Sequence, residues 1–190
     1  MTDIQSLRDI IQALDHAKIP YMLTGSLAST YYSAPRMTQD IDLVIAPASA
    51  QLKILIQFLP EDDYYADLNL AMEAWRHQSM FNVLNMRTGW KIDLIMRKPG
   101  AYSQEAFQRR KQATVEGVSL FVATVEDVII SKLEWAKLGE SSRQIRDVAN
   151  VLNFQSDGLD RAYLERWINE LGLVTQWNAA RGESESSFLK

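Results

Sequence analysis

The chain has 190 residues, of which 47% are hydrophobic and 23% charged, and its formal net charge at pH 7 is −4. These values indicate one globular domain, or one domain with a small appendage, and an acidic balance that argues against a long polyanion as the main ligand. The absence of cysteine excludes disulfides, thiolate metal sites and thiol catalysis. The sequence has no signal-peptide pattern and no apolar run of membrane-spanning length, so we expect a cytoplasmic protein without a membrane partner.

Hydrophobic periodicity and breaker residues predict alternating helices and strands in the first half of the chain. Helices are expected at 4–17, 26–33, 48–59 and 67–76, and strands at 21–24, 40–45, 81–85 and 91–96. The last two strands flank the turn residues Arg87-Thr88-Gly89 and form a predicted hairpin.

The second half begins with a polar helix after Pro99-Gly100 and two short strands near 114–115 and 118–122. Helices then follow at 125–138, 142–154 and 160–171, and we expect the polar tail 181–187 to be frayed. The predicted fold class is α/β (α+β), in which a mixed sheet flanked by helices (1–123) precedes a C-terminal helical region (124–190).

Two aspartates share one face of a predicted strand. Asp40 and Asp42 are separated by Ile41, so their side chains point the same way, about 6–7 Å apart along the chain. Asp93 supplies a third carboxylate from the apolar strand 91–96, although an exposed edge strand is an alternative interpretation of that segment. Carboxylate oxygens are the ligands that Mg²⁺ prefers, so the three aspartates are predicted metal ligands and catalytic residues.

A glycine turn stands between the first predicted strand and the next helix. Gly25 and Ser26 would offer backbone N–H groups and a hydroxyl to the phosphates of a nucleotide at the start of that helix, where the dipole favours anions. Glycine matters because a side chain would hold the phosphate away. Together with the aspartates, this turn indicates nucleotidyl transfer.

The combination of Gly25-Ser26, Asp40-Ile41-Asp42 and a later strand-borne Asp93 resembles the DNA polymerase β-type nucleotidyltransferase superfamily. Within it, the chain is most similar to bacterial nucleotidyltransferase-like proteins that include the AbiEii toxins of type IV toxin–antitoxin systems. The resemblance covers about residues 18–152. It implies a nucleotidyltransferase core followed by a helical part, with NTP as substrate and two Mg²⁺ ions at Asp40, Asp42 and Asp93.

The same resemblance extends to the helical part, where that group carries a lysine on one helix and an Arg-x-x-x-Asp signature on the next. Lys132 matches the lysine and is a predicted nucleotide ligand, while Arg143 and Asp147 match the signature. Lys132 falls on the apolar stripe of its helix, so its ammonium needs an anionic partner, either the triphosphate or a carboxylate such as Asp147. Arg143 and Asp147 are four residues apart, and an ordinary surface pair explains them equally well.

The predicted function is Mg²⁺-dependent transfer of an NMP from an NTP to a hydroxyl acceptor, which is a protein, a tRNA or a small molecule. A toxin with an antitoxin partner is the favoured branch. The alternatives are a small-molecule, antibiotic-type nucleotidyltransferase, whose cationic substrate would suit the acidic chain, and a non-catalytic nucleotidyltransferase-like binding protein.

Overall fold

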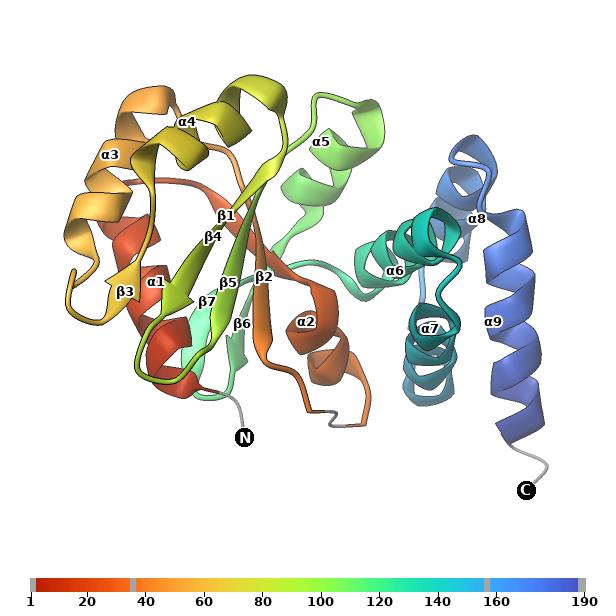
Figure 1. The fold of residues 1–190 in the computed structure, drawn as a ribbon. Coiled ribbons are helices and arrows are strands. Elements are labelled where there is room, and N and C mark those ends of the chain that lie inside the picture. Colours follow the sequence, from red (N-terminus) through yellow and green to blue (C-terminus); the bar gives the residue numbers. More distant parts are fainter. Residues whose placement is uncertain (1–2, 35–36, 156–157, 188–190) are drawn as a thin grey trace. The chain divides into compact units, whose positions relative to one another are not determined.

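The structure is a computed structural model that describes residues 3–34, 37–155 and 158–187 (Figure 1). The chain divides into two compact units. Unit 1 consists of Met1–Leu27 and Met37–Val122, and unit 2 consists of Ala28–Arg36 and Ala123–Lys190.

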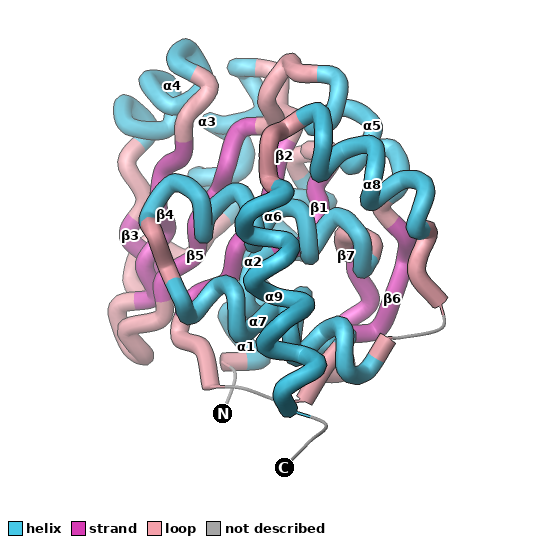
Figure 2. Tube along the Cα trace, turned by 90° about the vertical axis from the view of Figure 1, so that its right-hand side faces the viewer, coloured by secondary structure: helices cyan, strands magenta, loops and turns pink. Residues whose placement is uncertain are grey.

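One mixed sheet forms the centre of unit 1. Within the described residues it has seven strands in the order β3-β4-β5-β2-β1-β7-β6, which can be followed across Figure 2. The pairs β2/β5 and β1/β7 are parallel, and the other neighbours are antiparallel. The strands are β1 (Tyr21–Thr24), β2 (Asp40–Ile45), β3 (Tyr64–Tyr65), β4 (Met80–Asn85), β5 (Lys91–Met96), β6 (Lys111–Val115) and β7 (Val118–Val122).

Helices α1 (Ile4–His16), α3 (Ser49–Phe58) and α4 (Leu68–His77) lie side by side on one face of this sheet (Figure 1). Because strand side chains alternate between faces, every second residue of β2 points into the resulting core, and Ile41, Leu43 and Ile45 are fully buried. The intervening residues of β2 are only partly buried. Helix α5 (Ala101–Arg109) follows β5, and the predicted hairpin β4–β5 is confirmed.

Unit 2 is helical, with α6 (Val125–Gly139), α7 (Ser142–Phe154), α8 (Arg161–Glu170) and α9 (Val174–Ser187). Thr124 caps α6 by accepting a hydrogen bond from the backbone N–H of Asp127 at 3.3 Å. Polar contacts tie α8 to α6, because the Tyr163 hydroxyl donates to Asp127 Oδ1 at 2.6 Å. The predicted fold class, α+β with a mixed sheet and a C-terminal helical part, is confirmed.

The expectation that residues 181–187 are frayed is wrong, because α9 continues to Ser187. Ala180 and Ser184, one helical turn apart, are both buried, and the Ser184 hydroxyl donates to Asn153 of α7. A narrow inward stripe therefore holds a helix whose composition is otherwise polar. None of the helices in the described ranges has the length and apolar character needed to cross a membrane.

Candidate active site

A row of polar side chains crosses four neighbouring strands of the sheet. The strand register pairs Thr24 of β1 with Asp42 of β2, Asp42 with Asp93 of β5, and Asp93 with Asn82 of β4. Residues opposite each other on paired strands share a face, so these four side chains stand together on the face away from Leu43. Adjacent strands are about 4.8 Å apart, which makes Asp42 and Asp93 direct neighbours.

Asp40 belongs to the next row of the same face. It lies two residues before Asp42 on β2 and pairs in register with Lys91 of β5. The structure therefore brings the three predicted aspartates onto one face of unit 1. They differ in exposure, because the side chain of Asp40 is 50% exposed whereas that of Asp93 is only 9% exposed.

Two residues that the sequence analysis did not single out hold the Asp93 carboxylate. Lys91 Nζ lies 2.9 Å from Asp93 Oδ2 and 3.8 Å from Asp40 Oδ1, and the Asn82 side-chain amide donates to Asp93 Oδ1. The hydrogen bond to Asp93 raises the pKa of the Lys91 ammonium; partial burial opposes this effect, and the charges of Asp93, Asp40 and Asp42 reinforce it. A signal for Lys91 was present in the sequence, since it precedes Asp93 by two residues and so shares its face.

The glycine turn packs directly against Asp42. Gly25 has φ of +66°, a left-handed conformation, and a Cβ placed on it would overlap with the Asp42 carboxylate. Gly25 and Ser26 form the first turn of α2 (Gly25–Tyr32), which follows β1 without a loop. The predicted phosphate-binding turn thus adjoins the predicted metal-binding carboxylates, and only glycine fits at its first position.

The carboxylates suit a hard divalent cation in their chemistry. The described residues contain no cluster of three or more His, Cys, Asp or Glu side chains gathered closely enough to form a metal cage. Mg²⁺ does not need one, because proteins usually bind it through one or two carboxylates together with substrate phosphates and water. The neighbouring pair Asp42 and Asp93, beside a side-chain-free turn, fits that mode.

Lys132 lies in unit 2 and is held by a buried ion pair. Its Nζ is 2.7 Å from Asp147 Oδ2 and 3.1 Å from Gln144 Oε1, and the Lys132 and Asp147 side chains are 3% and 6% exposed. The carboxylate partner that the apolar stripe of α6 requires is therefore Asp147 of α7 in this structure. A contact of Lys132 with a nucleotide stays a prediction.

Several solved structures share the fold, although the sequence matches no protein-family model and no curated protein. The antibiotic-resistance factor ANT(2'')-Ia superposes with a TM-score of 0.58 at 16% identity, over 96% of this chain and 97% of that one. The lincomycin-bound lincosamide antibiotic adenylyltransferase LnuA gives 0.51 at 13% identity, over 77% and 94%. A nucleotidyltransferase-like protein from Paracoccidioides brasiliensis gives 0.51 at 18% identity, over 93% of both chains. The chain thus has a nucleotidyltransferase-like fold.

Proposed function

We propose that this protein is a Mg²⁺-dependent nucleotidyltransferase that moves an NMP from an NTP to a hydroxyl acceptor. The observation that carries the proposal is the arrangement of Asp40, Asp42 and Asp93 on one sheet face, with the Gly25-Ser26 turn against Asp42. A purely structural row of aspartates would not require a left-handed glycine in contact with one of them. The nucleotidyltransferase-like fold adds support.

The residues have distinct roles in this proposal. Asp40, Asp42 and Asp93 hold Mg²⁺, which when bound neutralises the charge that develops on the triphosphate. Gly25 and Ser26 bind the β- and γ-phosphates. The acceptor oxygen bonds to the α-phosphorus, the bond from that phosphorus to the bridging oxygen breaks, and pyrophosphate leaves. Asp93 takes the proton of the acceptor hydroxyl, and Lys91 and Asn82 fix the orientation of its carboxylate.

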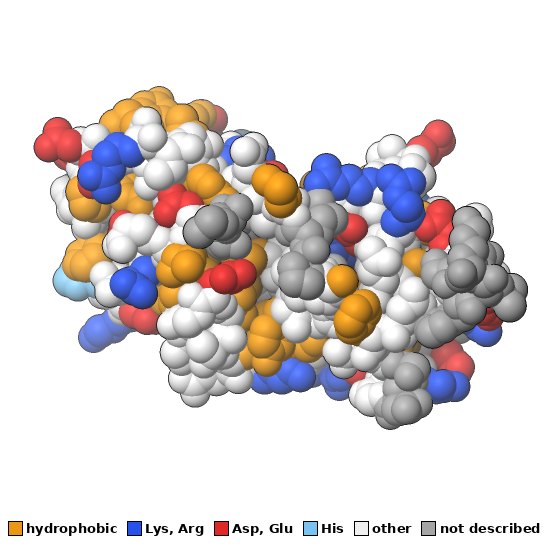
Figure 3. Space-filling model, turned by 90° about the horizontal axis from the view of Figure 1, so that it is seen from below, with side chains coloured by type: hydrophobic (Ala, Val, Ile, Leu, Met, Phe, Trp, Pro, Cys, Tyr) orange, Lys and Arg blue, Asp and Glu red, His pale blue; other side chains and the backbone are white. Residues whose placement is uncertain are grey.

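A small molecule is the acceptor class that we favour. Two proteins with this fold are an antibiotic-resistance factor and a lincosamide antibiotic adenylyltransferase, and a further ANT(2'')-Ia structure contains adenylyl-2''-tobramycin. The net charge of −4 suits a cationic acceptor better than a tRNA. Where Figure 3 shows the surface of the described residues, both basic and acidic side chains are present.

The toxin branch predicted from the sequence differs only in the acceptor and the partner. It requires growth inhibition on overexpression that depends on Asp40 and Asp42 and is relieved by an antitoxin. Growth inhibition that persists in the Asp40→Ala/Asp42→Ala variant would exclude this branch. Antibiotic protection in an expressing strain would instead favour the small-molecule acceptor.

The direct test is incubation of the purified protein with Mg²⁺ and each NTP radiolabelled at the α-phosphorus, together with tobramycin, lincomycin, total tRNA or cell lysate. We expect label transfer to one acceptor class by the wild type and by Asp62→Asn, a control in an exposed turn of unit 1. Asp42→Asn should transfer no label. Failure of both wild type and Asp62→Asn to transfer label or bind NTP would support the non-catalytic alternative and refute the enzyme proposal.

A further inference from the structure

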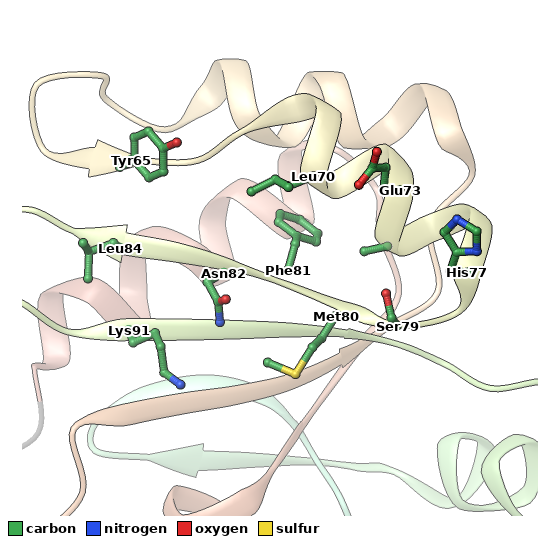
Figure 4. A pocket seen from close by; sticks show the side chains of 11 residues that line it. Tyr65, Leu70, Glu73, His77, Ser79, Met80, Phe81, Asn82, Leu84 and Lys91 are labelled. Carbon is green, nitrogen blue, oxygen red and sulfur yellow. The ribbon is translucent and has the colours of Figure 1, made fainter.

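A groove opens at the edge of the sheet in unit 1, between α4 and β4 (Figure 4). It has a volume of about 590 Å³, within the range of about 300–1,000 Å³ that is typical of small-molecule sites. Four residues of α4 line it at the spacing of one helical face: Leu70, Glu73, Ala74 and His77. We propose that this groove binds the acceptor and that the acceptor is a small amphipathic molecule with a hydroxyl, an apolar body and an amine; the inference rests on the proposed function.

The walls of the groove provide the apolar part of the recognition. Tyr65, Leu70, Met80 and Leu84 line it and are 56%, 54%, 39% and 39% exposed. Large apolar side chains exposed singly are ordinary, but a group of them around one concavity is typical of a binding site. An apolar or aromatic ring is the chemistry that such walls would cover.

One end of the groove is formed by two residues that contact the predicted catalytic carboxylate, Asp93. Asn82 and Lys91 line the groove, and the same two side chains contact the two oxygens of Asp93. Asn82 and Lys91 project from the sheet face opposite to α4 (Figure 4), so the groove passes around the outer edge of β4. A molecule that follows the groove from α4 around this edge would bring its hydroxyl toward the group proposed to accept the proton. This continuity distinguishes the groove from an isolated surface hollow.

The charges that line the groove favour an amine on the acceptor. Glu73 is exposed and forms no ion pair with any other residue that the structure describes. The ammonium of Lys91 is already engaged by Asp93 and Asp40, so it does not cancel the charge of Glu73. A protonated amine is the complement of this carboxylate.

An added peptide strand is the rival occupant, because the outer edge of β4 is partly open. On this outer edge, β3 pairs with Asn85 and Leu84 only, and Met80–Val83 have no second strand partner in the described part of the chain besides β5. Four residues are fewer than a typical strand of about 5–6, so main-chain pairing there would be short. The volume and the exposed side chains favour the small molecule.

The test is an amide-resolved NMR titration of the full chain, without nucleotide or Mg²⁺, using phenylethanolamine, phenylethanol and ethanolamine as probes. Phenylethanolamine should shift the amides of α4 and β4 and the side-chain amide of Asn82. Glu73→Gln should weaken the binding of phenylethanolamine about threefold and leave the binding of phenylethanol unchanged. Leu70→Ser should weaken both aromatic probes, while the exposed controls Glu61→Gln and Leu138→Ser should change nothing.

Absence of these shifts, or shifts that Leu70→Ser and Glu73→Gln leave intact, would overturn the inference. So would a strand-forming Thr-Val peptide that shifts the Met80–Val83 amides where phenylethanolamine does not. Because the titration needs neither NTP nor metal, it separates the two proposals. Nucleotidyl transfer without probe binding would refute the groove alone. Probe binding without transfer would keep the groove as a small-molecule site but refute both the enzyme proposal and the acceptor role.

Discussion

Lys91 places its ammonium 2.9 Å from Asp93 Oδ2 and also within 3.8 Å of Asp40 Oδ1, so one lysine spans two of the three proposed metal ligands. A positive charge among carboxylates offsets their mutual repulsion when no metal is bound. A divalent cation would supply the same compensation. We therefore expect Lys91 and Mg²⁺ to act in part as substitutes for each other.

Replacing Lys91 by Met should lower the free energy of unfolding in metal-free buffer by about 1 kcal/mol, because Asp93 loses its counter-charge. The unfolding midpoint should fall accordingly. Added Mg²⁺ should restore more stability to this variant than to the wild type. Thermal denaturation with and without Mg²⁺ measures both effects, and Lys98→Met is a control at an exposed position of the same unit. Equal stabilisation of wild type and Lys91→Met by Mg²⁺ would contradict the idea that Lys91 and Mg²⁺ can replace each other.

The Lys91–Asp93 pair also predicts a pH dependence. The pKa of Lys91 is raised above 10.5 in the folded protein, so the folded state holds this proton more tightly than the unfolded state. The stability from the pair is thus fully present below pH 10.5 and is lost as pH rises through the raised pKa. The gap in unfolding midpoint between wild type and Lys91→Met should narrow in that alkaline window. Tyrosines also ionise in this pH range, but they are the same in both proteins and their effect cancels in the difference. A difference in unfolding midpoint that stays constant with pH would argue against the pair.

Gly25→Ala should destabilise the protein and abolish nucleotidyl transfer, because the new methyl group would overlap with the Asp42 carboxylate. Gly89 offers a matched control. It has φ of +73° against +66° at Gly25, yet a Cβ there meets nothing within 4 Å. Both substitutions should lower the free energy of unfolding by about 1 kcal/mol, because alanine is strained in the left-handed backbone conformation. Only Gly25→Ala should lower it further. Similar unfolding free energies for the two variants would mean that the contact with Asp42 is easily relieved.

Breaking the Lys132–Asp147 pair should cost about 3–5 kcal/mol of stability, because either single variant removes the opposite charge that lies 2.7 Å from a buried ionised group. The double variant Lys132→Met/Asp147→Leu should recover much of that loss. Chemical denaturation gives the three values. Nucleotide affinity of the double variant then decides the role of Lys132: unchanged affinity fits a purely structural lysine, and a marked loss fits the predicted phosphate contact.

Local rules were sufficient for the carboxylates of β2. Strand alternation placed Asp40 and Asp42 on one face, and the turn residues predicted the hairpin of β4 and β5. The pairing of β2 with β5 is a long-range event, so the sequence could suggest Asp93 but not its register opposite Asp42. Asn82 meets Asp93 through the register of β4 with β5, which the turn residues alone did not determine, whereas Lys91 lies two residues before Asp93 on the same strand and could have been found from the sequence.

Tertiary packing also explains features that could not be predicted from composition or periodicity. β3 has only two residues and is formed by pairing with β4. A strand this short has no hydrophobic periodicity from which it could be predicted. Helix α9 is polar in composition and is stabilised by its contact with α7. For Lys132 the stripe on α6 implied an anionic partner, and the packing of α7 against α6 supplies Asp147.

The division of α2 between the two units has a consequence for synthesis on the ribosome. Gly25 and Ser26 emerge early, in unit 1, but Tyr32 at the other end of the same helix belongs to unit 2. Its hydroxyl donates to the carbonyl of Ala123, which is 91 residues later, and its carbonyl accepts from Gln155, which is 123 residues later. A nascent chain that stops at Val122 therefore carries every proposed metal ligand but lacks those partners of the helix that we propose to bind phosphate. The ability to bind nucleotide would then arise only towards the end of translation.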